Sequence, residues 1–271
     1  MAIITISRGS YSKGKSVAES VAAKLGYQCV SRDVLLEASK EYNIPEIHLT
    51  RAIHDAPSIF KGRQSREKYI AYIRAALLKS FSQDNVVYHG LAGHFFVSGI
   101  SHVVKVRIMA DLEDRVREEM QREGIDRHTA LAVIKKEDEH RRRWSRDLYN
   151  IDTWDASLYD LVIHIRHLTT EDAAALICQT ARLPQFAPTP ESRKKLADPL
   201  LAAQIKAALV DIRFDIDVRV DGGAVRVQTD AAPTAHEELK AQITAAVQKF
   251  PEVTDVQVKL ARLTPYGEDG I

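Results

Sequence analysis

A glycine-rich stretch near the start of the chain has the residue types that bind a polyphosphate. It reads Gly9-Ser10-Tyr11-Ser12-Lys13-Gly14-Lys15-Ser16 and fits the pattern G-x-x-x-x-G-K-[ST], the P-loop. In a P-loop the backbone N–H groups point at an anion, the lysine reaches the β- and γ-phosphates, and the hydroxyl ligates Mg²⁺. We therefore expect residues 9–16 to bind ATP, with Lys15 catalytic and Ser16 a magnesium ligand.

A second stretch, Ile125–Tyr149, carries several arginines on a predicted helix that Asp126 would cap. One face of this helix starts apolar and becomes charged, in the order Leu131, Ile134, Asp138, Arg141, Arg142 and Ser145. Phosphoryl transfer needs positioning and positive charge more than covalent help. The pattern therefore predicts a lid in which Arg141 and Arg142 neutralise the moving phosphoryl group and Asp138 orients a guanidinium. The alternative is a solvated basic face that pairs with acidic residues of the same helix.

The elements that must position these residues alternate between strands and helices. Apolar and β-branched runs predict strands at Ala2–Ile6, Asn85–Tyr88, His102–Met109 and Tyr159–Ile165. Helical patterns lie between them, notably at Ser16–Leu25, Arg66–Phe81 and Leu112–Arg122. This alternation is typical of an α/β fold with a mostly parallel sheet flanked by helices. Ligands of such sheets bind beyond the carboxyl ends of the strands, which is where the P-loop follows its strand.

The composition limits the classes of function. The chain of 271 residues has a net charge of +1, a pI near 7.8 and 45% hydrophobic residues. No basic excess indicates binding to nucleic acid or to an anionic membrane, so any anion site must be local. Cys29 and Cys178 have no metal-binding or redox spacing. The lack of a leader peptide or a long apolar run predicts a cytoplasmic protein.

The pattern changes after a segment rich in proline and charge. This segment, residues 184–197, is predicted to be an exposed linker between a domain of residues 1–183 and a smaller domain of residues 198–265. The second domain has the predicted order αββαβ, with a tight turn at Asp221-Gly222-Gly223. Its helices are expected at Pro199–Val210 and Thr234–Lys249, and its strands at Phe214–Val220, Ala224–Thr229 and Val256–Leu260.

The first domain resembles the cytidylate kinase-like family of P-loop nucleotide kinases over roughly Ala2 to Ala181. Besides the P-loop, the resemblance is carried by Ile4-Thr5-Ile6-Ser7-Arg8, Leu25-Gly26-Tyr27, Leu112-Glu113-Asp114-Arg115-Val116, Lys136-Glu137-Asp138-Glu139-His140-Arg141-Arg142 and Trp154-Asp155. It implies transfer of the γ-phosphoryl group of ATP to a nucleoside monophosphate, with CMP or dCMP as the expected acceptor. It also implies Mg²⁺ as the cofactor that accompanies ATP.

Position within the family motifs also implies roles for single residues. Arg115 would lie near the ATP base or the lid hinge, and Asp138 would belong to the lid that faces the substrates. Arg32 and Asp33 would lie near the acceptor pocket. The acceptor phosphate would be met by residues of a mobile segment, for which the candidates are Arg63 and Arg66.

Two departures from the family pattern concern the acceptor side. Ser31 stands where the family usually has Asp, and Gly90 is followed by Leu91 where the family tends to have Arg. An arginine that grips the monophosphate is therefore missing at that position, and His89 and His94 are the candidates to replace it.

The magnesium site has one more candidate ligand. No acidic residue ends the strand at Val86–Tyr88, so Asp33 is the candidate for the second ligand of Mg²⁺.

The second domain resembles a BON domain in its αββαβ order, in Asp198-Pro199, in Asp221-Gly222-Gly223 and in Phe250-Pro251-Glu252-Val253-Thr254-Asp255-Val256. BON domains are usually discussed as binders of phospholipid or envelope, but a large basic patch is lacking, so a regulatory or interaction module is expected. Two other functions stay open: a nucleotide sensor in which ATP binding regulates this module without much transfer, and a lipid-associated protein. The oligomeric state is also left open.

Overall fold

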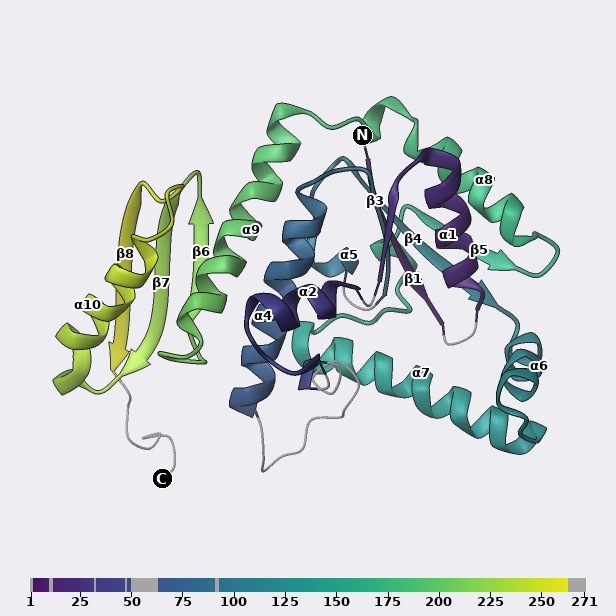
Figure 1. Cartoon of the computed structure of the whole chain (residues 1–271), viewed down its shortest axis with the longest axis horizontal. Helices are drawn as coiled ribbons and strands as arrows, with labels where there is room; N and C mark the ends of the chain where they lie inside the picture. The colour runs from purple at the N-terminus through teal and green to yellow at the C-terminus, as the bar shows by residue number, and fades with distance from the viewer. Residues whose placement is uncertain are drawn as a thin grey trace, which may run out of the picture.

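The computed structural model describes residues 2–9, 12–31, 33–46, 48–49, 63–90 and 93–262. The first part is a five-stranded sheet in the order β2-β3-β1-β4-β5, in which every neighbouring pair is parallel. Its strands are β1 (Ile3–Arg8), β2 (Gln28–Val30), β3 (Val86–His89), β4 (Val103–Ala110) and β5 (Leu161–Ile165). Helices flank both faces of the sheet (Figure 1), which confirms the predicted α/β architecture.

Different helices cover the two faces of this sheet. The face that includes Ile4 and Ile6 is buried under α1 (Gly14–Leu25) and α8 (Thr170–Ala181). The face that includes Ile3 and Val103 is buried under α2 (Asp33–Glu41), α4 (Arg63–Phe81), α5 (Gly93–Phe96) and the later helix α9 (Pro190–Leu209). Because both faces are covered, most of the strands are largely apolar, and short β-branched runs therefore predict four of them. The short strand β2 was not among the predicted strands.

The arginine-rich helix is α7 (Arg127–Tyr149), and it packs on α6 (Leu112–Glu123). Asp126 caps it as predicted, because its carboxylate accepts hydrogen bonds from the backbone N–H groups of His128 (2.8 Å) and Thr129 (3.1 Å). α7 runs across the end of the sheet at which β1 leads into the P-loop (Figure 1). The packing with α6 thus holds a row of arginines over the predicted anion site.

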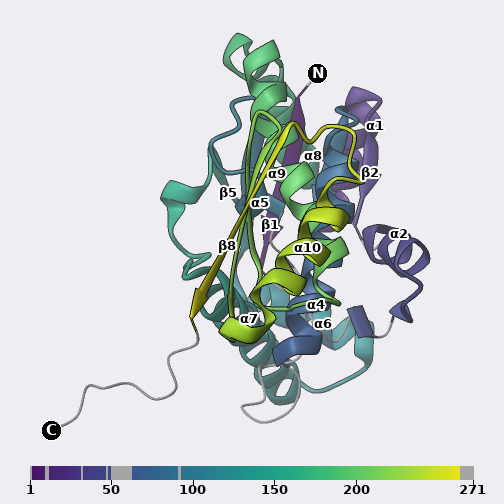
Figure 2. The same ribbon diagram turned by 90° about the vertical axis from the view of Figure 1, so that its left-hand side faces the viewer.

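A three-stranded sheet forms the C-terminal part. Its strands are β6 (Asp217–Asp221), β7 (Ala224–Ala231) and β8 (Asp255–Arg262), antiparallel between β6 and β7 and parallel between β7 and β8. Both α9 and α10 (His236–Val247) contribute to the core on one face of this sheet, and Figure 2 shows α10 nearest to the viewer. The predicted turn lies between β6 and β7, where Gly222 and Gly223 have φ values of 56° and 89° that favour glycine.

The predicted linker needs one correction, because α9 begins at Pro190 and includes residues 190–197. Thr189 and Ser192 cap each other's backbone N–H groups, and Pro190 occupies a first-turn position that needs no N–H donor. α9 then contributes side chains to two hydrophobic cores. Leu196 and Ala203 pack in the core of the first sheet, and Ile205 packs in the core of the second. The segment is mostly exposed, as expected for the linker, but from Pro190 onward it is helical. None of the helices in the described ranges is long and apolar enough to cross a membrane.

Candidate functional site

The P-loop turns tightly from β1 into α1. The Ser12 hydroxyl is buried, donates to the carbonyl of Gly9 (3.0 Å) and lies 3.2 Å from the carbonyl oxygen of Ile108 on β4. Lys13 has a left-handed φ of 61° and leads the chain into α1. A Cβ on Gly14 would lie 2.7 and 2.9 Å from side-chain carbons of Arg8, so only glycine fits there without displacement. The loop therefore presents the first N–H groups of α1 at the sheet end. Ser10 and Tyr11 fall outside the described residues.

Lys15 and Ser16 lie exposed in the first turn of α1, and Asp33 is exposed at the start of α2. The Lys15 ammonium is 3.7 Å from the carboxylate of Glu19, one turn later. The charges of Lys15 and Asp33 both act on the pKa of His89, which burial and the Arg8 guanidinium lower to about 4. Lys15 and Asp33 are therefore close enough to the end of β3 for their charges to act on His89. Arg32 lies outside the described residues.

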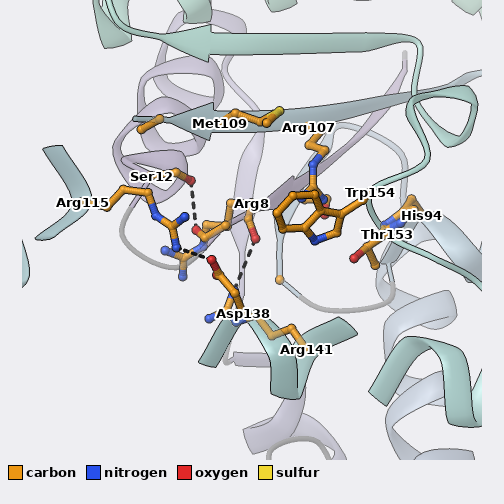
Figure 3. Close-up of a pocket in the computed structure, with 14 residues that line it drawn as sticks. Arg8, Ser12, His94, Arg107, Met109, Arg115, Asp138, Arg141, Thr153 and Trp154 are labelled. Carbon is orange, nitrogen blue, oxygen red and sulfur yellow. Dashed lines mark hydrogen bonds and ion pairs between the residues drawn. The ribbon is translucent and has the colours of Figure 1, made fainter. Parts of the chain in front are cut away.

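A small pocket opens at the P-loop under α7, and it brings together five of the residues predicted for the ATP site and the lid: Gly9, Ser12, Arg115, Asp138 and Arg141. Figure 3 shows the lid residues Asp138 and Arg141 on one side of it and β4 residues on the other. The Nη1 atom of Arg141 donates to the backbone carbonyl of Arg8 at 3.4 Å. The free volume is about 60 Å³, far below the several hundred Å³ typical of a nucleotide pocket. α7 is therefore in a closed position over the loop.

Asp138 orients a guanidinium, as predicted, and that guanidinium belongs to Arg115 on α6. The Nη2 atom of Arg115 is 2.6 Å from Oδ2 of Asp138, and both side chains are largely buried. The same guanidinium lies 3.6 to 3.8 Å from the position that a Cβ on Gly9 would occupy. The pair thus links α6, α7 and the first residue of the P-loop (Figure 3).

Arg142 does not line the pocket in this structure. Its Nε and Nη2 atoms bind both carboxylate oxygens of Asp152 at 3.1 and 2.7 Å, and its guanidinium lies 5.4 Å from the centre of the Trp154 ring. Arg146 also donates to Asp152, at 2.6 Å. The hydrogen bonds from Arg142 hold the pKa of Asp152 well below its usual range. Arg142 thus fastens residues 152–154 to the lid.

Of the two arginines proposed for the acceptor side from α4, Arg66 does not line this pocket. Arg66 is half-buried in the first turns of α4. The side chain of Arg63 lies outside the part of the chain that can be described. Their proposed contact with an acceptor stays a prediction.

The pocket also has a second wall, on which His94 is the one residue that the sequence singled out, as a candidate for the acceptor phosphate. It is formed by Arg107 from β4, His94 from α5, and Thr153 and Trp154 from the segment before β5. The Tyr159 hydroxyl supports this wall, at 3.2 Å from Nε2 of His94 and 3.0 Å from the carbonyl oxygen of Thr153. The available sequence signal was the pair of basic residues, Lys105 and Arg107, inside a mostly apolar strand.

Burial of two histidines makes the stability of the protein depend on pH. Burial, reinforced by the charges of Arg107 and Lys105, lowers the pKa of His94 to about 3, as burial also lowers that of His89. Below the ordinary value of 6.5, the unfolded chain takes up protons that these native histidines do not bind. The free energy of unfolding should therefore fall as the pH decreases from 6.5 towards these lowered values, by about 1.4 kcal/mol per histidine and pH unit.

The measurement is urea unfolding of wild type and His94→Gln at about pH 7.5 and about pH 5.5. The loss of unfolding free energy between the two pH values should be about 1.4 kcal/mol smaller in His94→Gln. His128→Gln, at an exposed position on α7, is the control and should keep the wild-type difference. An equal loss in wild type and His94→Gln would contradict the buried neutral state of His94.

Comparisons with known proteins identify relatives of the first domain. Residues 3–167 match the family model described as the cytidylate kinase-like family. A cytidylate kinase of Sulfolobus acidocaldarius is 31% identical over 176 residues, which cover 64% of this chain and 91% of that protein. A cytidylate kinase of Archaeoglobus fulgidus is 28% identical over 187 residues, which cover 66% of this chain and 94% of that protein. The sequence resemblance of the first domain is thereby confirmed.

A solved structure shares the fold. It is an uncharacterized protein from Eubacterium ventriosum, with a TM-score of 0.51 and 22% identity, and the match covers 67% of this chain and 98% of that one. The family match ends at residue 167, before α9 begins. The C-terminal sheet therefore lies beyond the matched family region.

Proposed function

The chain belongs to the cytidylate kinase-like family and is a nucleotide or small-molecule kinase, and within that class we propose that it phosphorylates CMP or dCMP with ATP. In this reaction a phosphate oxygen of the acceptor bonds to the γ-phosphorus, the bond from that phosphorus to the β–γ bridging oxygen breaks, and ADP leaves. The observation that carries the proposal is the placement of Arg141 on α7 over the P-loop at the end of β1.

The P-loop is proposed to hold ATP through the N–H groups of residues 9–16, with Lys15 reaching the β- and γ-phosphates. Mg²⁺ would neutralise phosphate charge, and it commonly takes only one or two protein oxygens together with phosphate oxygens and water. The exposed Ser16 hydroxyl and Asp33 carboxylate fit that need, and no cluster of three metal-ligating side chains occurs within the described ranges. The site thus suits magnesium that arrives with the nucleotide.

The lid is proposed to open for substrates and to close for the transfer. The closed cavity of about 60 Å³ admits no nucleotide, so α7 must move away from Arg8 before ATP binds. Its return would exclude water, which would otherwise accept the phosphoryl group, and would place Arg141 beside the phosphates. Arg142, bound to Asp152, would carry Trp154 with it. Asp138 and Arg115 would move as one ion pair.

The acceptor phosphate is proposed to enter from the side of Arg32 and Asp33. Arg63 and Arg66 would approach its phosphate from α4. Turnover tests the acceptor directly: ADP release is measured with ATP, Mg²⁺ and each common nucleoside monophosphate in turn. We expect turnover to be fastest with CMP or dCMP. ATP binding without turnover on any acceptor would instead support a nucleotide sensor.

The C-terminal part is proposed to be a BON-like module with a regulatory or interaction role. Support comes from the observed order α9, β6, β7, α10 and β8, and from a hydrogen bond of 3.0 Å that the Gly222 N–H donates to the Asp198 carboxylate. That bond joins two of the motifs on which the resemblance depends. Binding of the whole chain to vesicles of anionic lipid would favour the lipid-associated alternative.

A further inference from the structure

Arg107 is a buried cation on the pocket wall that it forms with His94, Thr153 and Trp154. It lies on β4 directly beside Ser7 of β1 in the parallel register, and its side chain reaches the pocket next to Trp154 (Figure 3). Only 7% of its surface is exposed. This position is on the sheet face opposite to α1, and therefore across the sheet from Lys15.

The contacts of Arg107 hold its guanidinium without neutralising it. Its Nη1 atom is 3.4 Å from the Tyr159 hydroxyl, and its guanidinium lies 5.7 Å from the Tyr159 ring centre and 6.0 Å from that of Trp154. No carboxylate pairs with it among the residues that the structure describes. A buried charge without a counter-ion is costly, so this arrangement favours an anion in the pocket.

The groups that contact Arg107 are neutral, although Arg8, Arg115 and Arg141 also line the pocket. Ser7 and Tyr159 contribute hydroxyl groups 3.3 Å apart, and Thr153 contributes its backbone carbonyl. His94 stays uncharged near neutral pH because burial lowers its pKa to about 3. Arg115, on the other side of the pocket, already has the Asp138 carboxylate at 2.6 Å. On the wall formed by Arg107, His94, Thr153 and Trp154, the charge of Arg107 is therefore not neutralised by a carboxylate among the described residues.

We propose that Arg107 binds the phosphate group of the acceptor, in place of the arginine missing after Gly90. The proposal rests on the kinase function proposed above, because it assigns the second anion site of that reaction. Gly90 itself lines the pocket that Arg107 enters, so the positive charge reaches the same space from a different strand. The exposed indole of Trp154, at the same wall, leaves a flat apolar surface for the base.

The test compares Arg107→Met with Lys105→Met. Lys105 is on the same face of the same strand but outside the pocket, so its variant controls for loss of one positive charge. In Arg107→Met we expect KM for CMP to rise about 100-fold and KM for ATP to change less than about threefold. The melting temperature without ligand should stay equal or rise, because an uncompensated buried charge is gone. Stabilisation by CMP in a thermal shift should disappear, and stabilisation by ATP should remain.

Arg107→Lys keeps the positive charge but loses the planar guanidinium that can donate two parallel hydrogen bonds to a phosphate. Its affinity for CMP should therefore lie between those of wild type and Arg107→Met. If Arg107→Met does not fold, the lysine variant supplies the test, with an expected rise of about 10-fold in KM for CMP alone. A wild-type KM for CMP in either folded variant would overturn the proposal, as would a lower melting temperature combined with full stabilisation by CMP.

The same experiment separates this proposal from the proposed function. If the wild-type protein phosphorylates no acceptor but CMP or inorganic phosphate stabilises it, and stabilises Arg107→Met no longer, the anion site stands and the kinase reaction fails. If wild type phosphorylates CMP and Arg107→Met does so with unchanged KM, the reaction stands and the assignment of Arg107 fails.

Discussion

Lys15→Ala is expected to lower kcat by about 10²–10³-fold while the protein stays folded. The ammonium would stabilise charge that develops on the β- and γ-phosphates in the transition state. The effect on folding should be small, because the Lys15 side chain is 65% exposed and pairs with the exposed Glu19 at 3.7 Å. An exposed pair of that kind contributes little to stability.

The control is Lys24→Ala, which removes the same charge from the other end of α1, where Lys24 pairs with Glu171. It should keep the wild-type kcat. Steady-state assays with ATP and the fastest acceptor give kcat for each variant, and circular dichroism checks the fold. If Lys15→Ala kept more than about a tenth of the wild-type kcat, the P-loop would not be performing the chemistry proposed for it.

The parts of the site that could be predicted from the sequence are those whose geometry depends on one short segment of the chain. Gly14 is required by the close approach of Arg8, and Asp126 caps α7 through N–H groups two and three residues away. Both effects depend on near neighbours in the chain, so a motif is enough to predict them. The αββαβ order of the second domain was predictable for the same reason, since its strands alternate and its turn has two glycines.

Arg107 could not be assigned in this way, because its surroundings come from segments far apart in the chain. Ser7, His94 and Tyr159 meet it only after the sheet has formed. The start of α9 was missed for a local reason. Ser192 stands where the capping pattern has Glu or Gln, so the charged run after Pro190 was interpreted as an exposed linker.

The ion pair of Asp138 could be predicted only in part from the sequence. The sequence predicted that this carboxylate orients an arginine, but helical spacing could not decide which one. The packing of α6 on α7 settles the choice in favour of Arg115. That packing depends on Val116, Ala130 and Ile134, which form a small core away from the sheet.

Arg141→Ala is expected to lower kcat by about 10³-fold and to leave KM for ATP nearly unchanged. No carboxylate pairs with Arg141 in the described part of the chain, and the hydrogen bond of its guanidinium there is a long one, 3.4 Å, to the Arg8 carbonyl. That bond is easily exchanged for phosphate oxygens when the lid closes on substrates. A group that meets the phosphoryl oxygens only at closure lowers the barrier without adding to ground-state binding.

Lys135→Ala is the matched control, since it removes a positive charge from an exposed position of the same helix. It should keep the wild-type kcat, and Arg141→Lys should recover only part of it because the lysine has no planar fork. Single-turnover kinetics with saturating CMP distinguish the transfer step from product release. A rise in KM for ATP with kcat unchanged would assign Arg141 to ground-state binding, and no change in either constant would remove α7 from the catalytic machinery.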